Sequence, residues 1–203
     1  MKLSETKRRQ IIHAALLEFQ NRGFKSSSMD IISRKAEVSK RTVYNHFPSK
    51  DELFISVVLH ALEKMHDVIS TRFDPDTCIK KQLTHIALAE IGLLQSEEVL
   101  QFARMLLAEL ISSPNMAQLL ESRRPSFETK FDQWLKAAVQ HGALTIPDYE
   151  TAVQQFFSLL KGSAFWPALL ERKTMSKKQA EKVALSTVSL FLNSYANKSN
   201  TLG

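Results

Sequence analysis

The sequence predicts an all-α protein of about nine helices, and three observations support this fold class. Apolar residues recur at helical spacing through most of the 203-residue chain. Only five glycines and six prolines interrupt it, too few for the many turns of a β protein. We find no segment with the apolar and polar alternation of a half-buried strand. The length accommodates a small domain followed by a larger one.

The first helices are short and separated by clear punctuation. A helix is expected over residues 4–22, with Gly23 as its stop signal. Ser27 is expected to cap a second, short helix, and Ser39 a third over residues 40–47. This pattern of short helices with tight turns predicts a three-helix helix-turn-helix module.

A long helix follows the module. Pro48 ends the third helix, and the segment Ser49 to Glu52 is typical of a capping box that starts a fourth. We therefore predict two domains: the helix-turn-helix module over 1–48, and a larger helical domain over 49–203. The helix that starts at Ser49 connects the two.

Breakers such as the Gly142 to Pro147 stretch divide the remaining chain. Pro125 is a site at which the predicted segment over 115–141 splits or kinks. Helices are expected near 76–92, 96–112, 115–141, 148–162 and 176–197.

Positive charge is concentrated at the start of the chain. Residues 1–50 hold 11 Lys and Arg against 4 Asp and Glu, a net charge of +7, whereas residues 51–203 hold 16 against 17, a net charge of −1. A basic head on a nearly neutral body indicates a surface that binds a polyanion. DNA is the leading candidate, although RNA or an anionic membrane surface would satisfy the same charge.

The segment 27–54 carries the most specific motif, and it reads SSMDIISRKAEVSKRTVYNHFPSKDELF. It resembles the TetR family of bacterial regulators, in which a Ser or Thr cap, an Ala-Gly-Val-Ser turn, a Tyr-x-x-Phe and a Lys-Glu-Leu occur in this order. Glu37 departs from the glycine that is usual in the turn, so it either adopts a left-handed conformation or shifts the turn. A weaker resemblance, at Gly142 to Leu144, Asp148 and 152–156, is to AcrR-like regulatory domains.

A recognition helix places its N-terminal residues against base edges in the major groove. Lys40 and Arg41 are therefore the foremost candidates, since no structural need explains two adjacent cations there. The resemblance implies phosphate contacts for several neighbours, and helix caps add others. The full predicted DNA-binding set is Ser27, Ser28, Ser39, Lys40, Arg41, Thr42, Tyr44, Asn45, His46 and Lys50.

The resemblance implies a DNA-binding domain over 1–48 and a regulatory, ligand-binding and dimerisation domain over 49–203. It also implies a cavity in the C-terminal bundle that binds a small hydrophobic or amphipathic effector. Each aromatic or apolar candidate for its lining is explained equally by ordinary core packing. Glu109, in an otherwise apolar stretch, is a candidate to orient a cationic or hydroxylated ligand. The candidates are Met65, Ile69, Phe102, Met105, Leu106, Glu109, Phe127, Phe131, Trp134, Phe165 and Trp166.

The predicted helices near 148–162 and 176–197 carry more apolar residues than one buried stripe requires. This favours a homodimer interface over a helix pair buried in one subunit. The candidates are Phe156, Phe157, Leu160, Val183, Leu185, Val188, Phe191, Leu192 and Tyr195.

Other functions fit the sequence less well. Motifs for a phosphate loop, nucleophile or paired carboxylates were not found, which disfavours an enzyme. The Cys and His residues lack metal-site spacing, and we expect no cofactor. Without a signal peptide or an apolar span, we expect a cytoplasmic protein without a membrane partner. The interpretation is a ligand-responsive repressor on a palindromic double-stranded operator; an activator, and a helical scaffold without a DNA role, remain as alternatives.

Overall fold

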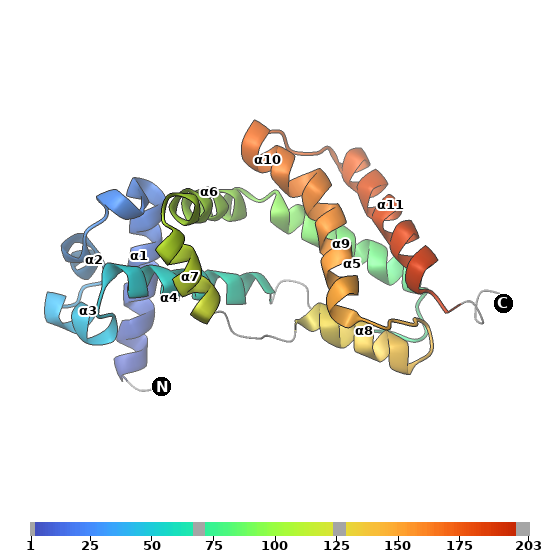
Figure 1. Ribbon diagram of the computed structural model, residues 1–203, viewed down its shortest axis with the longest axis horizontal. Helices are drawn as coiled ribbons and strands as arrows, with labels where there is room; N and C mark the ends of the chain where they lie inside the picture. The colour runs from blue at the N-terminus through green and yellow to red at the C-terminus, as the bar shows by residue number, and fades with distance from the viewer. Residues whose placement is uncertain (1–2, 67–71, 124–128, 198–203) are drawn as a thin grey trace. The chain divides into compact units, whose positions relative to one another are not determined.

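The computed structural model describes residues 3–66, 72–123 and 129–197, and within them every regular element is helical (Figure 1). An isolated β-bridge joins Leu144 and Ala196. The all-α fold class is thereby confirmed. The elements are α1 (Leu3–Ser26), α2 (Met29–Lys35), α3 (Lys40–His46), α4 (Lys50–His66), α5 (Ile79–Leu94), α6 (Glu97–Ser112), α7 (Pro114–Arg123), α8 (Lys130–Gln140), α9 (Tyr149–Leu160), the π-helical η1 (Lys161–Phe165), α10 (Trp166–Glu171) and α11 (Lys177–Tyr195).

The chain forms two compact units, each with its own hydrophobic core. Unit 1 comprises Met1–Met65 and Gln101–Ser126, and unit 2 comprises His66–Leu100 and Phe127–Gly203. In this division α4, most of α6 and α7 pack with the first three helices, whereas the predicted boundary after residue 48 follows the order of the sequence and stays a prediction. That arrangement joins segments distant in sequence, so local signals cannot reveal it.

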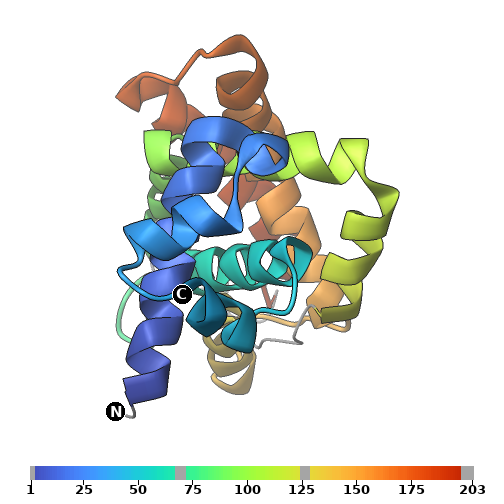
Figure 2. The same cartoon turned by 90° about the vertical axis from the view of Figure 1, so that its left-hand side faces the viewer.

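The core of unit 1 holds the three short helices together. Phe19 of α1, Ile32 of α2 and Val43 of α3 are fully buried in it, with Phe54 of α4. Helix α2 packs against both α1 and α3 (Figure 2). The rings of Phe19 and Phe54 meet edge to face, with centroids 5.4 Å apart. Aromatic packing of this kind fixes how the helix-turn-helix lies on α4.

The core of unit 2 lies among α5, α8, α9 and α11. Helix α5 contacts α9, α11 and η1. Phe131 of α8 stacks on Phe156 of α9 at 4.8 Å between centroids, and Phe191 of α11 meets Phe156 edge to face. Large buried aromatic side chains therefore make the contacts between helices here.

Most helix boundaries agree with the sequence within a few residues. The segment over 115–141 is split into two helices: α7 ends at Arg123, and α8 begins at Lys130 after the N-cap Thr129, which forms a capping box with Asp132. Pro125 itself lies outside the described residues. Gly23 leaves helical geometry at φ 75° and ψ 164°, which kinks α1 at the predicted stop.

None of the helices in the described ranges is both long and apolar enough to cross a membrane.

Candidate DNA-binding site

Helix α3 is held by its apolar side and its cap. Val43 and Phe47 are buried in the core of unit 1. The Ser39 hydroxyl accepts a hydrogen bond from the Thr42 amide at 3.1 Å, as predicted for an N-cap, and its oxygen lies 2.8 Å from Thr42 Oγ1. These contacts set the position of α3 and leave its other side to solvent.

The polar residues of α3 lie on its accessible side. Lys40, Arg41, Tyr44 and Asn45 are exposed, and His46 is half-buried, as is Thr42. Within the described residues, Arg41 has no ion pair, whereas Lys40 Nζ lies 2.7 Å from Asp30 Oδ1. An exposed helix side with cations at its N-terminal end has the chemistry for base edges and phosphates.

The turn before α3 resolves the question that Glu37 raised. Glu37 adopts φ 55°, the left-handed conformation that glycine accepts at lower cost. The Val38 amide donates to the Ser33 carbonyl oxygen at 3.0 Å, and the Glu37 amide to that of Arg34 at 3.2 Å. The usual geometry of the turn is thus retained without its glycine.

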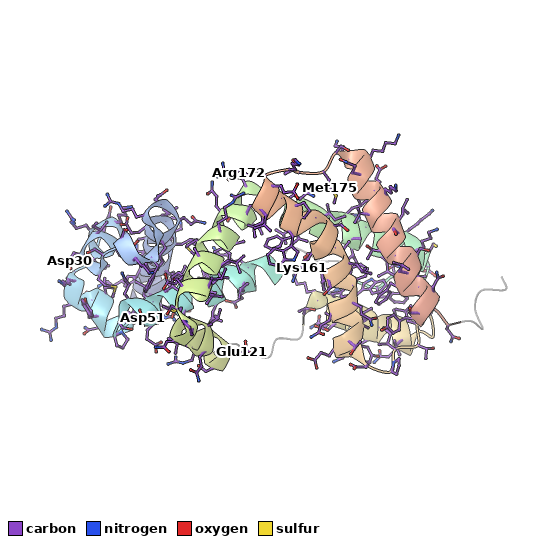
Figure 3. The ribbon with its side chains drawn as sticks, turned by 45° about the horizontal axis from the view of Figure 1, so that its top comes forward. Asp30, Asp51, Glu121, Lys161, Arg172 and Met175 are labelled. Atoms are coloured by element: carbon purple, nitrogen blue, oxygen red, sulfur yellow. The ribbon has the colours of Figure 1, made fainter. Side chains whose placement is uncertain are left out.

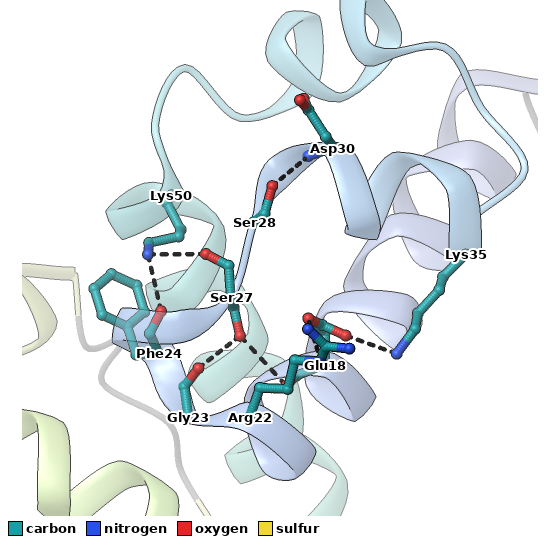
Figure 4. Close-up of polar contacts among 9 residues, drawn as sticks. All are labelled: Glu18, Arg22, Gly23, Phe24, Ser27, Ser28, Asp30, Lys35 and Lys50. Carbon is teal, nitrogen blue, oxygen red and sulfur yellow. Dashed lines mark hydrogen bonds and ion pairs between the residues drawn. The ribbon is translucent and has the colours of Figure 1, made fainter.

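Ser28, not Ser27, caps α2. The Ser28 hydroxyl accepts a hydrogen bond from the Asp30 amide at 3.2 Å, whereas Ser27 is buried (Figure 4). The Ser27 hydroxyl donates to the carbonyl oxygen of Gly23 at 2.6 Å and contacts that of Glu18 at 3.3 Å. The expected cap at Ser27 is wrong by one residue, because this hydroxyl is buried and donates to carbonyl oxygens of α1 instead. Its predicted DNA contact would require giving up a buried hydrogen bond.

The Lys50 side chain is bonded to backbone carbonyl oxygens of its own chain. Its ammonium donates to the carbonyl oxygens of Phe24 at 2.8 Å and Ser27 at 3.1 Å (Figure 4). It also donates to the Lys25 carbonyl oxygen at 3.4 Å and lies 4.4 Å from the centroid of the Phe24 ring. An ammonium group has three donors, and these carbonyls account for all of them. A phosphate contact at Lys50, which the family resemblance implies, would replace one of these bonds. Ser49 accepts from the Glu52 amide at 3.1 Å, as expected for a cap.

A buried carboxylate ties α1 to α2. The Glu18 side chain is fully buried, with Lys35 Nζ at 2.6 Å from Oε2 and Arg22 Nε at 3.5 Å from Oε1 (Figure 4). A buried charge is tolerated only when it is paired, so Lys35 at the end of α2 is held against α1. Sequence reasoning missed Glu18, because it lies among apolar residues and its partner is 17 positions away.

The predicted effector-binding residues are divided between the units. In unit 1, Phe102 and Met105 are buried in the core with Leu106 packed against it, and Glu109 on the same helix is 6% exposed. The side chain of Met65 is not described, and Ile69 and Phe127 lie outside the described residues.

In unit 2, Phe131 and Trp134 belong to the core, and Trp134 Nε1 donates to Gln82 Oε1 at 3.3 Å. Phe165 packs against that core, whereas Trp166 is 45% exposed. Trp134 thus already has a structural partner, which sequence periodicity does not reveal.

Several predicted interface residues belong to the core of one chain instead. Phe156, Leu160, Val188 and Phe191 are buried in unit 2, and of these Phe191 alone lines a surface hollow that the structure describes. Phe157, Val183, Leu192 and Tyr195 are half-buried, and Leu185 is 47% exposed.

Leu159 of α9 and Leu190 of α11 are 40% and 53% exposed. Both belong to the apolar residues of the two helices predicted to form the interface, although they are not in the predicted interface set. Both line two adjoining shallow hollows between α9 and α11, together with Gln155, Val183 and Tyr195. An apolar face of this kind on two adjacent helices is typical of a protein interface.

The fold and the exposed helix define a helix-turn-helix DNA-binding regulator, and family comparisons agree. Residues 11–57 match the family of bacterial regulatory proteins described as the tetR family, and residues 81–197 match the C-terminal domain of AefR-like transcriptional repressors. The chain belongs to the TetR family, which is a family of transcriptional regulators rather than enzymes. For the C-terminal region the matching description is AefR-like, where the sequence resemblance suggested AcrR-like members.

Similar proteins carry corresponding descriptions. The regulator SrpR of Pseudomonas putida is 29% identical, over 78% of this chain and 74% of its own length. The regulator UidR of Escherichia coli is 28% identical over 72% of both chains. A TetR-family regulator structure from Pseudomonas syringae is 35% identical with a TM-score of 0.73, covering 96% of this chain and 99% of its own. The flavonoid-responsive regulator FrrA is 25% identical with a TM-score of 0.75, over 95% and 98% of the two chains.

Proposed function

We infer that the chain is a repressor that binds a palindromic operator as a homodimer and leaves it when a small hydrophobic or amphipathic effector binds. The observation that carries this proposal is the exposed polar side of α3, with Arg41 unpaired among the described residues and Lys40 beside it. The match of the C-terminal region to AefR-like transcriptional repressors favours repression. An operator placed to activate a promoter would use the same contacts.

The direct DNA contacts are assigned to the accessible residues of α3. Arg41 has the fork geometry that pairs with a guanine edge, and Lys40 reaches guanine or phosphate. Tyr44 and His46 are assigned to phosphates, with Ser28, Ser39, Thr42 and Asn45 as further contacts. We assign Ser27 and Lys50 to support of the turn before α2, in view of their backbone partners.

Two copies are proposed to pair through the face between α9 and α11, centred on Leu159 and Leu190. A twofold axis brings the same patch of each copy together, so Leu159 and Leu190 of both copies would become buried in the interface. A dimer with two copies of α3 requires two half-sites, which is the reason for proposing a palindrome. Half-sites read in this way lie about 34–36 Å apart, or a multiple of that distance.

The effector is proposed to act by shifting a conformational equilibrium. A ligand that favours a conformation with α4 displaced moves the DNA-binding helices through Lys50, which bonds the end of α1 and the residue that follows it. Small changes in the separation of two recognition helices weaken binding to a fixed half-site spacing. FrrA is named as flavonoid-responsive, and flavonoids are small hydroxylated aromatic molecules of the proposed class. Glu109 is the candidate group for a ligand hydroxyl or cation.

Selection of bound duplexes from a random-sequence pool tests the DNA part of the proposal. An enriched inverted repeat, bound by two copies of the chain, is expected. Enrichment of a single asymmetric site, or of no sequence, would overturn it. The effector part is tested on the selected duplex with a panel of flavonoids and other small hydroxylated aromatic compounds. Release of the DNA by at least one compound, with the dimer intact, is expected; unchanged affinity at saturation contradicts the effector class.

A further inference from the structure

An ion pair joins the two helices of the helix-turn-helix at their N-terminal ends. Asp30 is the second residue of α2, and Lys40 is the first residue of α3. Lys40 Nζ lies 2.7 Å from Asp30 Oδ1, and both side chains are more than half exposed. Figure 3 shows Asp30 at the outer end of α2, on the helix-turn-helix. The pair therefore lies in the motif that contacts DNA.

The contact changes the chemistry of Lys40. The hydrogen bond to Asp30, followed by its negative charge, raises the pKa of the Lys40 ammonium, so the group stays protonated. One of its three donors points to the carboxylate, and two remain for other acceptors. The side chain also loses rotamer freedom when it is held in this way.

The two cations at the start of α3 thus differ. Arg41 is exposed and has no ion pair in the described part of the chain, so it can follow any phosphate within reach. Lys40 must leave a carboxylate to do the same, and it would leave that carboxylate facing a polyanion. A nonspecific duplex offers chiefly phosphates, so Lys40 adds less to the affinity for it than a lysine without an ion pair would.

We propose that Asp30 is a specificity-determining residue that acts through Lys40: it holds the ammonium where a base edge of the operator meets the two remaining donors, and it penalises contacts to phosphate alone. On the operator the pair stays intact, and the ordering of the lysine has already occurred before binding. On other sequences the pair breaks or Lys40 contributes nothing. This inference rests on the proposed reading of base edges by α3.

The test compares Asp30→Asn with the wild type on two probes: the duplex that the wild type selects from a random pool, and a scrambled duplex of the same composition. Asp51→Asn is the matched control, because Asp51 lies in the first turn of α4, is exposed and has no ion pair in the described residues. Affinities are measured by fluorescence anisotropy across a salt series.

For Asp30→Asn, affinity for the scrambled duplex is expected to rise by about tenfold, with a salt slope steeper by about 0.9, the value for one added phosphate contact. Affinity for the selected duplex is expected to stay level or fall, so the specificity ratio drops by about tenfold. Asp51→Asn should raise both affinities by the same small factor. In a Lys40→Met background, Asp30→Asn should leave the ratio unchanged.

Three results would overturn the inference. One is an equal rise on both duplexes for Asp30→Asn, as for Asp51→Asn, since that indicates charge alone. Another is a change of ratio that persists without Lys40. The third is that Asp30→Asn loses binding to both duplexes only because the variant has a lower melting temperature than the wild type. A wild type that prefers no sequence would refute the proposed function and this inference together. A wild type that prefers the selected duplex, with an Asp30→Asn variant that prefers it to the same degree, would refute the role of Asp30 alone.

Discussion

The Lys50 ammonium lies 2.8 Å from the carbonyl oxygen of Phe24 and donates a hydrogen bond to it. Lys50 is the first residue of α4, and Phe24 directly follows the kink at Gly23 in α1. Because the Ser27 carbonyl oxygen accepts a bond from the same ammonium, one side chain connects the start of α4 to the last turn of α1 and to the connection between α1 and α2.

Replacement of Lys50 by Met is expected to lower the free energy of unfolding by about 1–3 kcal/mol, because the backbone carbonyls that accept from the ammonium would lose their charged donor. Urea denaturation measures this. Lys25→Met is the control, because the Lys25 side chain is exposed on the same segment and has no side-chain contact among those described. If Lys50 instead served DNA alone, stability would be unchanged and the salt slope of binding would fall by about 0.9.

Glu37→Gly is expected to stabilise the protein by up to about 1 kcal/mol. Glycine adopts the left-handed conformation of this position without a steric penalty, although it loses more freedom on folding. Glu37→Ala retains a Cβ atom and should bring no gain, so the difference between the two variants isolates the backbone term. Equal stability of the two variants in thermal denaturation contradicts strain at this turn.

Glu90→Gln is expected to raise stability at neutral pH and to leave it unchanged in acid. Burial raises the pKa of the Glu90 carboxyl, only partly offset by the charge of Lys161. The folded protein therefore holds this proton to a higher pH than the unfolded chain, and stability falls as pH rises from the unfolded to the folded pKa. The glutamine variant lacks that loss. Parallel pH dependences of unfolding for the wild type and the variant would contradict the prediction.

Leu190→Glu is expected to weaken the proposed dimer by about 100-fold or more, because a carboxylate would be buried without a partner. Sedimentation velocity over a concentration series measures this. Leu170→Glu changes a residue that is also well exposed, on α10 outside the proposed face, and should leave the dimer intact. A Leu190→Glu variant that remains as dimeric as the wild type would refute this interface.

The local part of the structure could be predicted from the sequence, because caps and breakers act over three or four residues. Ser39, Ser49 and Gly23 each occupy the expected position. Ser27 and Ser28 compete for one cap, and the hydrogen bond of Ser27 to Gly23 decides the outcome, which no pattern in the sequence shows.

Contacts between distant segments could not be predicted in this way. Phe156 and Leu159 lie three positions apart on α9. The helical period alone does not show that the core of unit 2 buries Phe156 and leaves Leu159 exposed. The role of Lys50 depends on carbonyls more than 20 residues earlier. The exposed side of α3 was predictable because its motif is local; its pairing with Asp30 was not.

The central claim is that Arg41 on α3 reads DNA sequence. The direct measurement is the affinity of Arg41→Ala for the selected and the scrambled duplex by fluorescence anisotropy, with Arg72→Ala as a control that removes the same charge from unit 2. Arg41→Ala should lose about 10- to 100-fold of the preference for the selected duplex while its melting temperature is retained, and Arg72→Ala should keep the preference. A folded Arg41→Ala protein that discriminates between the duplexes as the wild type does would contradict the account.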